Sequence, residues 1–204
     1  MSSFLDVFTP EILFKVAVQS PQLWTALQQT CRHCRASLEP YRNEAISAWT
    51  THIAWTPHIQ TSDMAHWNEY TGLWCRGLEL KYGHSIRLNG KLHCEDEPAI
   101  RLQFSGTYVN DEEVDVECEE YWIQGLRHRS DGPAFTRVVK NKRGKIIEIL
   151  EDYWEQGQRH RSGAPATICW THKYNGCTAS YFEHGRWLRY EDNVDKISIW
   201  DIDQ

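Results

Sequence analysis

Residues 121–134 read Tyr-Trp-Ile-Gln-Gly-Leu-Arg-His-Arg-Ser-Asp-Gly-Pro-Ala, and residues 153–166 repeat them as Tyr-Trp-Glu-Gln-Gly-Gln-Arg-His-Arg-Ser-Gly-Ala-Pro-Ala. A weaker copy at residues 88–99 keeps the Gly, a His three positions later and a Pro-Ala pair. A fourth copy at residues 181–188 keeps the aromatic residues and the Gly but lacks the His and the Pro. Such repetition indicates one supersecondary unit that stacks on copies of itself, because a single copy cannot bury its apolar face alone. The pattern favours a binding or structural protein.

Each repeat is expected to form a strand, a turn and a second strand. Asn175-Gly176 suits a tight hairpin turn, and residues 141–144 form a polar turn. Before the second copy, Val114, Val116 and Cys118 alternate with acidic residues, which is typical of a strand with one face in water. The expected strands cover residues 114–119, 135–140, 145–154, 166–172 and 177–182.

The Tyr-Trp pair and the Arg-His-Arg triplet of each central copy form the candidate surface of the repeats. In a strand, one ring of each Tyr-Trp pair lies on each face, and the two arginines of a triplet share a face. The guanidinium groups then either form a patch that binds phosphate or carboxylate, or pair with neighbouring acidic side chains; pairing is favoured. The histidines are expected to be structural, within a chain reversal at Asp131-Gly132-Pro133. The candidate surface residues are Trp122, Arg127, His128, Arg129, Trp154, Arg159, His160 and Arg161, and the candidate acidic partners are Glu119, Glu120, Glu151 and Asp152.

The first seventy residues have a helical pattern with few glycines. Thr9-Pro10-Glu11 suits a helix start, since Thr can cap, Pro fits the first turn and Glu complements the helix dipole. Ser20-Pro21 has the same pattern of a capping residue before a proline and predicts a second helix start. A third helix is expected at residues 41–49. We place a helical domain at residues 1–62 and a β-repeat domain at residues 63–204. The expected fold class is α+β, with a small helical N-terminal region followed by an antiparallel β-sheet of repeated hairpins.

Composition and charge limit the partners and the compartment. The formal net charge of −6 disfavours binding to nucleic acid and to anionic membrane surfaces. No apolar stretch approaches the roughly 20 residues that span a bilayer, and the N-terminus lacks the pattern of a signal peptide. The seven cysteines follow no repeated spacing, which suits reduced thiols. We therefore expect a protein of the cytoplasm or nucleus that is not secreted.

The sequence shows no arrangement typical of an enzyme or of a cofactor site. Cys31 and Cys34, with His33 between them, could suggest a metal site, but they continue the apolar stripe of Trp24 and Leu27, and no second Cys/His pair at zinc spacing follows. We found no nucleophile with a base, phosphate loop or dinucleotide-binding motif. We therefore expect no catalytic residue, cofactor or metal.

The N-terminal region resembles the F-box motif. The resemblance covers about thirty residues, from Phe8-Thr9-Pro10-Glu11-Ile12-Leu13 to Thr30-Cys31-Arg32-His33-Cys34-Arg35, with Phe8 and Cys34 in place of the usual Leu and Trp. It implies docking onto the adaptor subunit of a cullin-type ubiquitin ligase. The alternative is that these residues only close a helical core. The residues that the resemblance assigns to docking are Phe8, Pro10, Ile12, Leu13, Leu23, Trp24 and Leu27.

The repeats look like MORN-type repeats of the "NGKxHRxDGPA" variety, which occur with F-box-like N-termini in large DNA viruses of amoebae. The resemblance covers roughly residues 70–190 and implies an elongated antiparallel sheet used as an interaction surface. The wider family suggests phospholipid contact, but the acidic residues within 111–120 make that less attractive.

Two functions follow from these resemblances. The first is a non-enzymatic interaction adaptor, whose helices hold the ligase adaptor subunit and whose repeats hold a target protein in the host cell. The alternative is a structural or virion-associated viral protein whose repeats form a scaffold. In that alternative the F-box-like helices are a relic or a dimer contact. Independently of it, an open sheet edge after the fourth copy is a candidate homodimer site, and the alternating tail at residues 195–201 could supply the last strand or an exchanged one.

Overall fold

The computed structural model describes residues 9–30, 32–55, 59–68, 71, 73–108, 112–172 and 176–192. Phe8, Cys31, Asn175 and the tail at residues 195–201 lie outside these residues. The chain divides into a helical unit of Met1–Thr51 with Arg87–Lys91 and a sheet unit of His52–Ile86 with Leu92–Gln204. The main division therefore falls about ten residues before the boundary that we placed after residue 62. None of the described helices is long and apolar enough to cross a membrane.

The helical unit contains α1 (Pro10–Ala17), α2 (Pro21–Thr30), α3 (Arg32–Leu38), a 3-10 turn (Glu39–Tyr41) and α4 (Arg42–Trp49). Thr9 precedes α1 with an extended backbone, but its hydroxyl makes no capping hydrogen bond to the helix, unlike the cap that the sequence suggested. Ser20 caps α2, because its Oγ accepts a hydrogen bond from the Leu23 amide at 3.1 Å. Both helices begin with proline, as predicted.

Aromatic contacts close the core of the helical unit. The Phe14 and Tyr41 rings stack at 4.8 Å, and Trp24 meets Trp49 edge to face at 5.6 Å. The Trp49 indole also donates a hydrogen bond to the Val18 carbonyl at 2.9 Å. The buried residues of this core are Leu13, Ala17, Trp24, Leu38 and Ala45.

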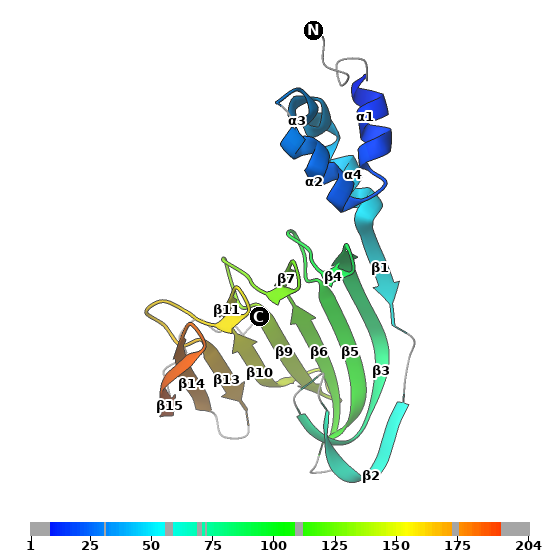
Figure 1. Ribbon diagram of the computed structural model, residues 1–204. Coiled ribbons are helices and arrows are strands. Elements are labelled where there is room, and N and C mark those ends of the chain that lie inside the picture. Colours follow the sequence, from blue (N-terminus) through cyan, green and yellow to red (C-terminus); the bar gives the residue numbers. More distant parts are fainter. Residues whose placement is uncertain are drawn as a thin grey trace. The chain divides into compact units, whose positions relative to one another are not determined.

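The sheet unit is built from antiparallel strands, so the predicted α+β class and antiparallel sheet are confirmed (Figure 1). The strands of the main path follow in the order β1-β3-β5-β6-β9-β10-β13-β14-β15, while β2 and β4 pair with β3. Their bounds are β1 (Thr50–Ala54), β2 (Ile59–Asn68), β3 (Leu73–Leu88), β4 (Lys91–Leu92), β5 (Ile100–Tyr108), β6 (Glu113–Glu120), β9 (Phe135–Asn141), β10 (Ile146–Asp152), β13 (Thr167–Thr171), β14 (Gly176–Glu183) and β15 (Arg186–Asp192).

Two small hairpins lie along one end of this sheet (Figure 1). The first pairs β7 (Trp122–Ile123) with β8 (Leu126–Arg127), and the second pairs β11 (Trp154–Glu155) with β12 (Gln158–Arg159). These hairpins contain the repeated sequence. The repeats therefore lie at one end of the sheet, and the longer strands form the main sheet.

The buried face of the sheet changes between β9 and β10. On β9, Phe135, Arg137 and Val139 are buried, whereas the register places buried Ile149 of β10 opposite half-buried Val138, on the other face. Ile149 in turn lies opposite Trp170 of β13. The sheet therefore carries one apolar cluster around Val116 and Val139 and a second one, on the opposite face, around Ile149 and Trp170.

Candidate functional site

The glycine shared by all four copies closes a tight hairpin turn. Each Gly and the residue before it have positive φ angles, at Asn89/Gly90, Gln124/Gly125, Gln156/Gly157 and His184/Gly185, with values between 45° and 83°. Two successive residues of this kind define a type I′ turn, which favours glycine at its second position. The tight turn is therefore three to four residues upstream of His128, while the segment at Asp131-Gly132-Pro133, where the sequence suggested a reversal, begins with a bend over residues 130–132. We call the units around these four glycines repeats 1 to 4.

A histidine links each of the first three repeats to the next. The Nδ1 atoms of His93, His128 and His160 accept hydrogen bonds from the amides of Gln124, Gln156 and His184, at 3.1, 3.3 and 3.3 Å. A neutral imidazole that accepts through Nδ1 carries its hydrogen on Nε2. In repeat 4, Leu188 stands at the histidine position. The histidine is thus present only where another repeat follows it.

The turn glycines make a second link between the repeats. The amides of Gly125, Gly157 and Gly185 donate to the carbonyls of Leu92, Arg127 and Arg159, at 2.8, 2.9 and 2.8 Å. Together with the histidine bonds, both positive-φ residues of the turns in repeats 2, 3 and 4 are held by the preceding repeat. The repeats therefore stack with one fixed geometry.

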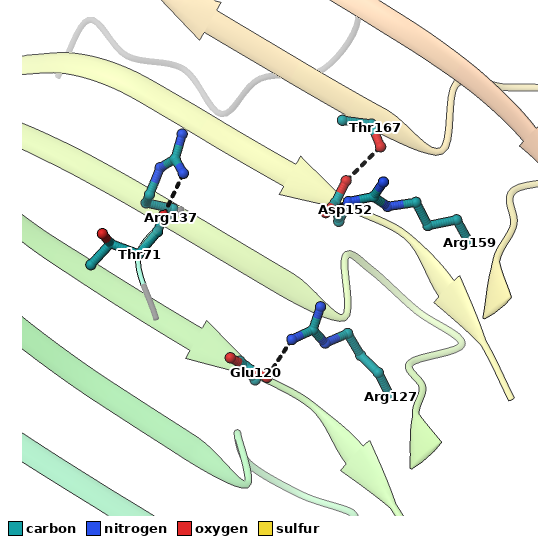
Figure 2. A network of polar contacts seen from close by, with 7 residues as sticks. All are labelled: Thr71, Glu120, Arg127, Arg137, Asp152, Arg159 and Thr167. Carbon is teal, nitrogen blue, oxygen red and sulfur yellow. Dashed lines mark hydrogen bonds and ion pairs between the residues drawn. The ribbon is translucent and has the colours of Figure 1, made fainter. Parts of the chain in front are cut away.

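The first arginine of each central triplet binds a buried carboxylate (Figure 2). Arg127 Nη2 lies 2.6 Å from Glu120 Oε2, and Arg159 Nη2 lies 3.0 Å from Asp152 Oδ2. Glu120 also accepts from the Trp122 indole at 2.8 Å, and Asp152 accepts from the Thr167 hydroxyl. These are two of the four acidic partners that the sequence suggested. Such bonds are charge-assisted and hold the small hairpins to the sheet.

Aromatic rings separate the two arginines in an alternating ladder. The Arg127 guanidinium lies 5.1 Å from the ring centres of both Trp122 and Trp154, and Arg159 lies 5.2 Å from Trp154 and 5.5 Å from Phe182. These are cation–π distances. Trp154 thus contacts both guanidinium groups and links the two repeats. We call this series the Arg–Trp ladder.

The second arginine of each triplet stacks on the tyrosine of its own repeat. Arg129 lies 3.9 Å from the Tyr121 ring centre, Arg161 lies 3.8 Å from Tyr153, and in repeat 4 Arg189 lies 3.6 Å from Tyr181. The predicted surface residues of the repeats are therefore all half-buried and take part in contacts within or between repeats. They do not gather into a patch of four free guanidinium groups.

Two grooves lie between successive repeats. The 2–3 groove has a volume of about 450 Å³ and is lined by parts of residues 128–132, 153–155 and 160–162. The 3–4 groove, of about 180 Å³, is lined by parts of residues 160–164, 181–183 and 188–189. His160, Arg161 and Ser162 line both. These grooves were not predicted from the sequence. The aligned copies do differ in the loops that line them, since repeat 2 has Asp131 where repeat 3 has Gly163.

One group of side chains has the composition of a metal site. Ligand atoms of Glu155, His160 and His184 all lie within 4.8 Å of one another. However, the two imidazole rings are stacked at 4.1 Å and nearly parallel, so their in-plane lone pairs cannot converge on one ion. His160 also uses Nδ1 to accept from the His184 amide, which leaves the hydrogen on Nε2, the atom that faces Glu155 at 3.6 Å. The present arrangement serves stacking better than metal binding.

Three cysteines of the sheet are poor nucleophiles. Burial raises the pKa of Cys118 to about 12 and that of Cys169 to about 11, and it also raises the pKa of Cys177. These thiols stay protonated at neutral pH. Cys34, in the helical unit, is fully buried in line with the expected packing role.

The residues that the F-box resemblance assigns to docking divide into two groups. Leu13 and Trp24 lie in the helical core, and Leu27 is half-buried. Ile12 and Leu23 are 44% and 37% exposed, and Pro10 is also exposed. Val16, one turn after Ile12, is 46% exposed. The helical unit thus leaves large apolar side chains in water although it has its own closed core.

Comparison with known proteins gave no match to a family model, a curated protein or a solved structure.

Proposed function

We propose that this protein is a non-enzymatic interaction adaptor, in which the helical unit binds the adaptor subunit of a cullin-type ubiquitin ligase and the repeats bind a target protein. The observation that carries the proposal is the exposure of Ile12, Val16 and Leu23 on helices whose core is already closed by Leu13 and Trp24. Exposed large apolar side chains on a small folded unit are typical of a protein-binding surface.

The resemblance to the F-box motif supports this choice of partner. Ile12 and Leu23 stand at positions that the resemblance assigns to docking, while Leu13 and Trp24 would hold the docking helices in place from the core. The MORN-like character of the repeats is part of the same proposal, as is an origin in a large DNA virus. Target capture would then take place in the cytoplasm or nucleus of the host cell.

The repeats suit the binding of a target protein because contacts between neighbouring repeats fix their geometry. The histidine links and the Arg–Trp ladder hold the hairpins, so the grooves between repeats are ordered before a partner arrives. A surface that is ordered in advance loses less conformational entropy on binding.

Titration calorimetry of the whole chain with the ligase adaptor subunit tests the proposal. We expect binding that weakens at least tenfold in Leu23→Asp, because burial of one large apolar side chain contributes about 1.5–3 kcal/mol. Gln22→Asp is the matched control, since Gln22 is the exposed neighbour and the same charge is introduced. Absence of binding by the folded wild-type chain, or equal loss in both variants, would reject the docking role.

The alternative function, a structural or virion-associated scaffold, has its own supporting observation. Strand β15 is the last strand of the main sheet path and leaves Trp187, Leu188 and Tyr190 at 58%, 44% and 52% exposure. Among the described strands, β15 has a partner on one side only, and an edge with exposed aromatic residues suits assembly with a second copy. Light scattering over a wide concentration range tests it: a dimer that Trp187→Lys dissociates supports the scaffold, and a constant monomer opposes it.

A further inference from the structure

We infer that Arg161 is a binding site for a carboxylate group, in the 2–3 groove. The inference rests on the proposed function in one respect, namely that in the cell this carboxylate belongs to an acidic side chain of the protein that the repeats bind. The existence of the site itself follows from a comparison among the repeats.

Three arginines stack on tyrosines in equivalent positions, and two of them have a carboxylate of their own. Arg129 Nε lies 2.8 Å from Asp131 Oδ1, and Arg189 Nε lies 2.8 Å from Glu191 Oε1. For Arg161, the described part of the chain offers the Tyr153 ring and the Pro165 carbonyl, which accepts from Nη1 at 3.5 Å, but no ion pair. Arg161 therefore has donor groups that its two counterparts use to bind an anion.

The aligned loops explain why Arg161 lacks this partner. Repeat 2 continues as Ser-Asp-Gly-Pro, whereas repeat 3 continues as Ser-Gly-Ala-Pro, so that Gly163 stands where repeat 2 has Asp131. A Cβ atom added to Gly163 would meet no atom within 4 Å. The space beside Arg161 is thus open, and a carboxylate from another molecule can enter it.

The surroundings of Arg161 prepare it for such a ligand. Stacking on Tyr153 fixes the plane of the guanidinium group, so that its N–H donors keep one direction. Three nearby acidic groups have contacts of their own: Glu151 accepts from the Tyr153 hydroxyl at 3.2 Å, Glu155 faces His160, and Asp131 binds Arg129. Glu183 lines the 3–4 groove with Arg161 but forms no ion pair with it in the described chain. Arg161 also lines both grooves, so it can be reached from either side.

A carboxylate fits this site better than a phosphate. Asp131 shows that a carboxylate binds the equivalent guanidinium in repeat 2, where it accepts a hydrogen bond from Arg129 Nε. The 2–3 groove also contains the acidic residues Asp131 and Glu155, whose charges repel a doubly charged phosphate more strongly than a singly charged carboxylate. The chemistry therefore selects an acidic side chain or a chain terminus.

Titration with sodium acetate, followed through the side-chain Nε–Hε signals of the arginines in NMR spectra, tests the site without any partner protein. Sodium chloride replaces acetate in the reference titration at equal ionic strength. We expect a saturable shift of the Arg161 signal, with little change at Arg129 and Arg189, because their own carboxylates compete with acetate.

Exchanging the loop sequences between repeats gives the matched variants. Gly163→Asp with Ala164→Gly gives repeat 3 the loop sequence of repeat 2. Gly163 has a φ of +71°, so a side chain there strains the backbone, and the Asn variant described next carries the same strain. We expect acetate binding to weaken at least about tenfold in the Asp variant, since the new carboxylate occupies Arg161. Gly163→Asn with Ala164→Gly has nearly the same shape without the charge and should keep the wild-type affinity. Asp131→Gly with Gly132→Ala should create a second response, at Arg129.

Three results would overturn the inference. They are a wild-type chain whose Arg161 signal does not saturate with acetate, an equal loss of binding in the Asp and Asn variants, and tighter binding of inorganic phosphate than of acetate. Because these titrations contain no ligase adaptor and no target, they can succeed or fail independently of the docking experiment with Leu23→Asp. Acetate binding together with failure of that experiment would keep the site and reject only the ligase role.

Discussion

The two central repeats and the two outer repeats differ in the residues that fill two equivalent positions beside each turn. Repeats 2 and 3 bury a carboxylate that binds an arginine, at Glu120/Arg127 and Asp152/Arg159. At the equivalent positions, repeat 1 has Ser85 with Leu92 and repeat 4 has Ser180 with Trp187. The acid and the arginine thus appear together or are both absent.

The position of the repeats in the stack explains this difference. Arg127 has a tryptophan from its own repeat on one side and a tryptophan from the next repeat on the other. An arginine in place of Trp187 would have no following repeat to provide the second ring. Since a desolvated charge is costly unless it is fully partnered, charge pairs belong inside the stack and uncharged residues at its ends.

The largest expected effect comes from separating a central charge pair. Glu120→Ala leaves the mostly buried Arg127 without its carboxylate and the Trp122 indole without its acceptor, so we expect a loss of about 3 kcal/mol in the free energy of unfolding. Urea denaturation followed by tryptophan fluorescence measures it.

The double variant Glu120→Ser with Arg127→Leu copies the chemistry of repeat 1 and separates pairing from packing. We expect it to recover most of the loss, to within about 1.5 kcal/mol of wild type, because no unpaired charge remains. A double variant as unstable as Glu120→Ala would show that the comparison with the outer repeats is wrong.

The turn glycines should show a moderate difference between inner and outer repeats. Gly157→Ala places a Cβ 3.2 Å from Leu126 Cδ2 at a φ of +81°, whereas the same change at Gly90, with φ +77°, meets no atom within 4 Å. We expect a cost of about 1–2 kcal/mol for backbone strain at either position, with Gly157→Ala the more costly. Thermal unfolding of the two variants measures the difference, and equal costs would indicate that Leu126 moves freely aside.

The histidine link should matter only where a repeat follows. His128→Ala removes the acceptor of the Gln156 amide, and we expect a loss of about 1 kcal/mol. Leu188→His introduces the same residue at the end of the stack, where the described chain offers no further turn, so no gain in stability is expected. Hydrogen exchange at the Gln156 amide checks the first expectation, and unchanged protection there would argue against the link.

The smallest effect concerns pH and the Arg129/Asp131 pair. The hydrogen bond and the charge of Arg129 lower the pKa of Asp131 in the folded chain, so this pair stabilises the fold above the unfolded pKa of about 3.9 and loses its effect as the pH falls through the lower folded value. Asp131→Asn should remove this contribution at neutral pH and leave stability unchanged at strongly acidic pH. Urea denaturation at both pH values measures it, and an equal difference at both would assign the effect to shape rather than charge.

Much of the fold was predictable because it depends on local patterns. The alternation around Val116 predicted a half-buried strand, and β6 has that character; the run at residues 135–140 corresponds to β9. Pro10 and Pro21 predicted the starts of α1 and α2. These features depend on residues close in sequence, which periodicity and turn chemistry describe directly.

The contacts between repeats were harder to predict. The sequence shows that His128 and His160 recur, but their partners are backbone amides of the next repeat, which carry no residue signature. The change of buried face between Val139 and Ile149 depends on strand register, and the register shifts between Ile146 and Glu148, within β10. A one-residue shift reverses the face of every later side chain, so alternation within each strand could not reveal it.

The histidine link also bears on how such a chain can grow. Each histidine accepts a hydrogen bond from the turn of the next repeat. The series stops at repeat 4, where Leu188 stands at the histidine position. A duplication of genomic sequence encoding about one inner repeat would insert a unit that already carries a histidine, an acid, an arginine and a receptive turn, so every new junction would be complete at once. A copy appended after repeat 4 would meet a leucine and form no such bond. Internal duplication would therefore preserve the histidine link at every new junction, whereas extension after repeat 4 would first need a histidine in place of Leu188.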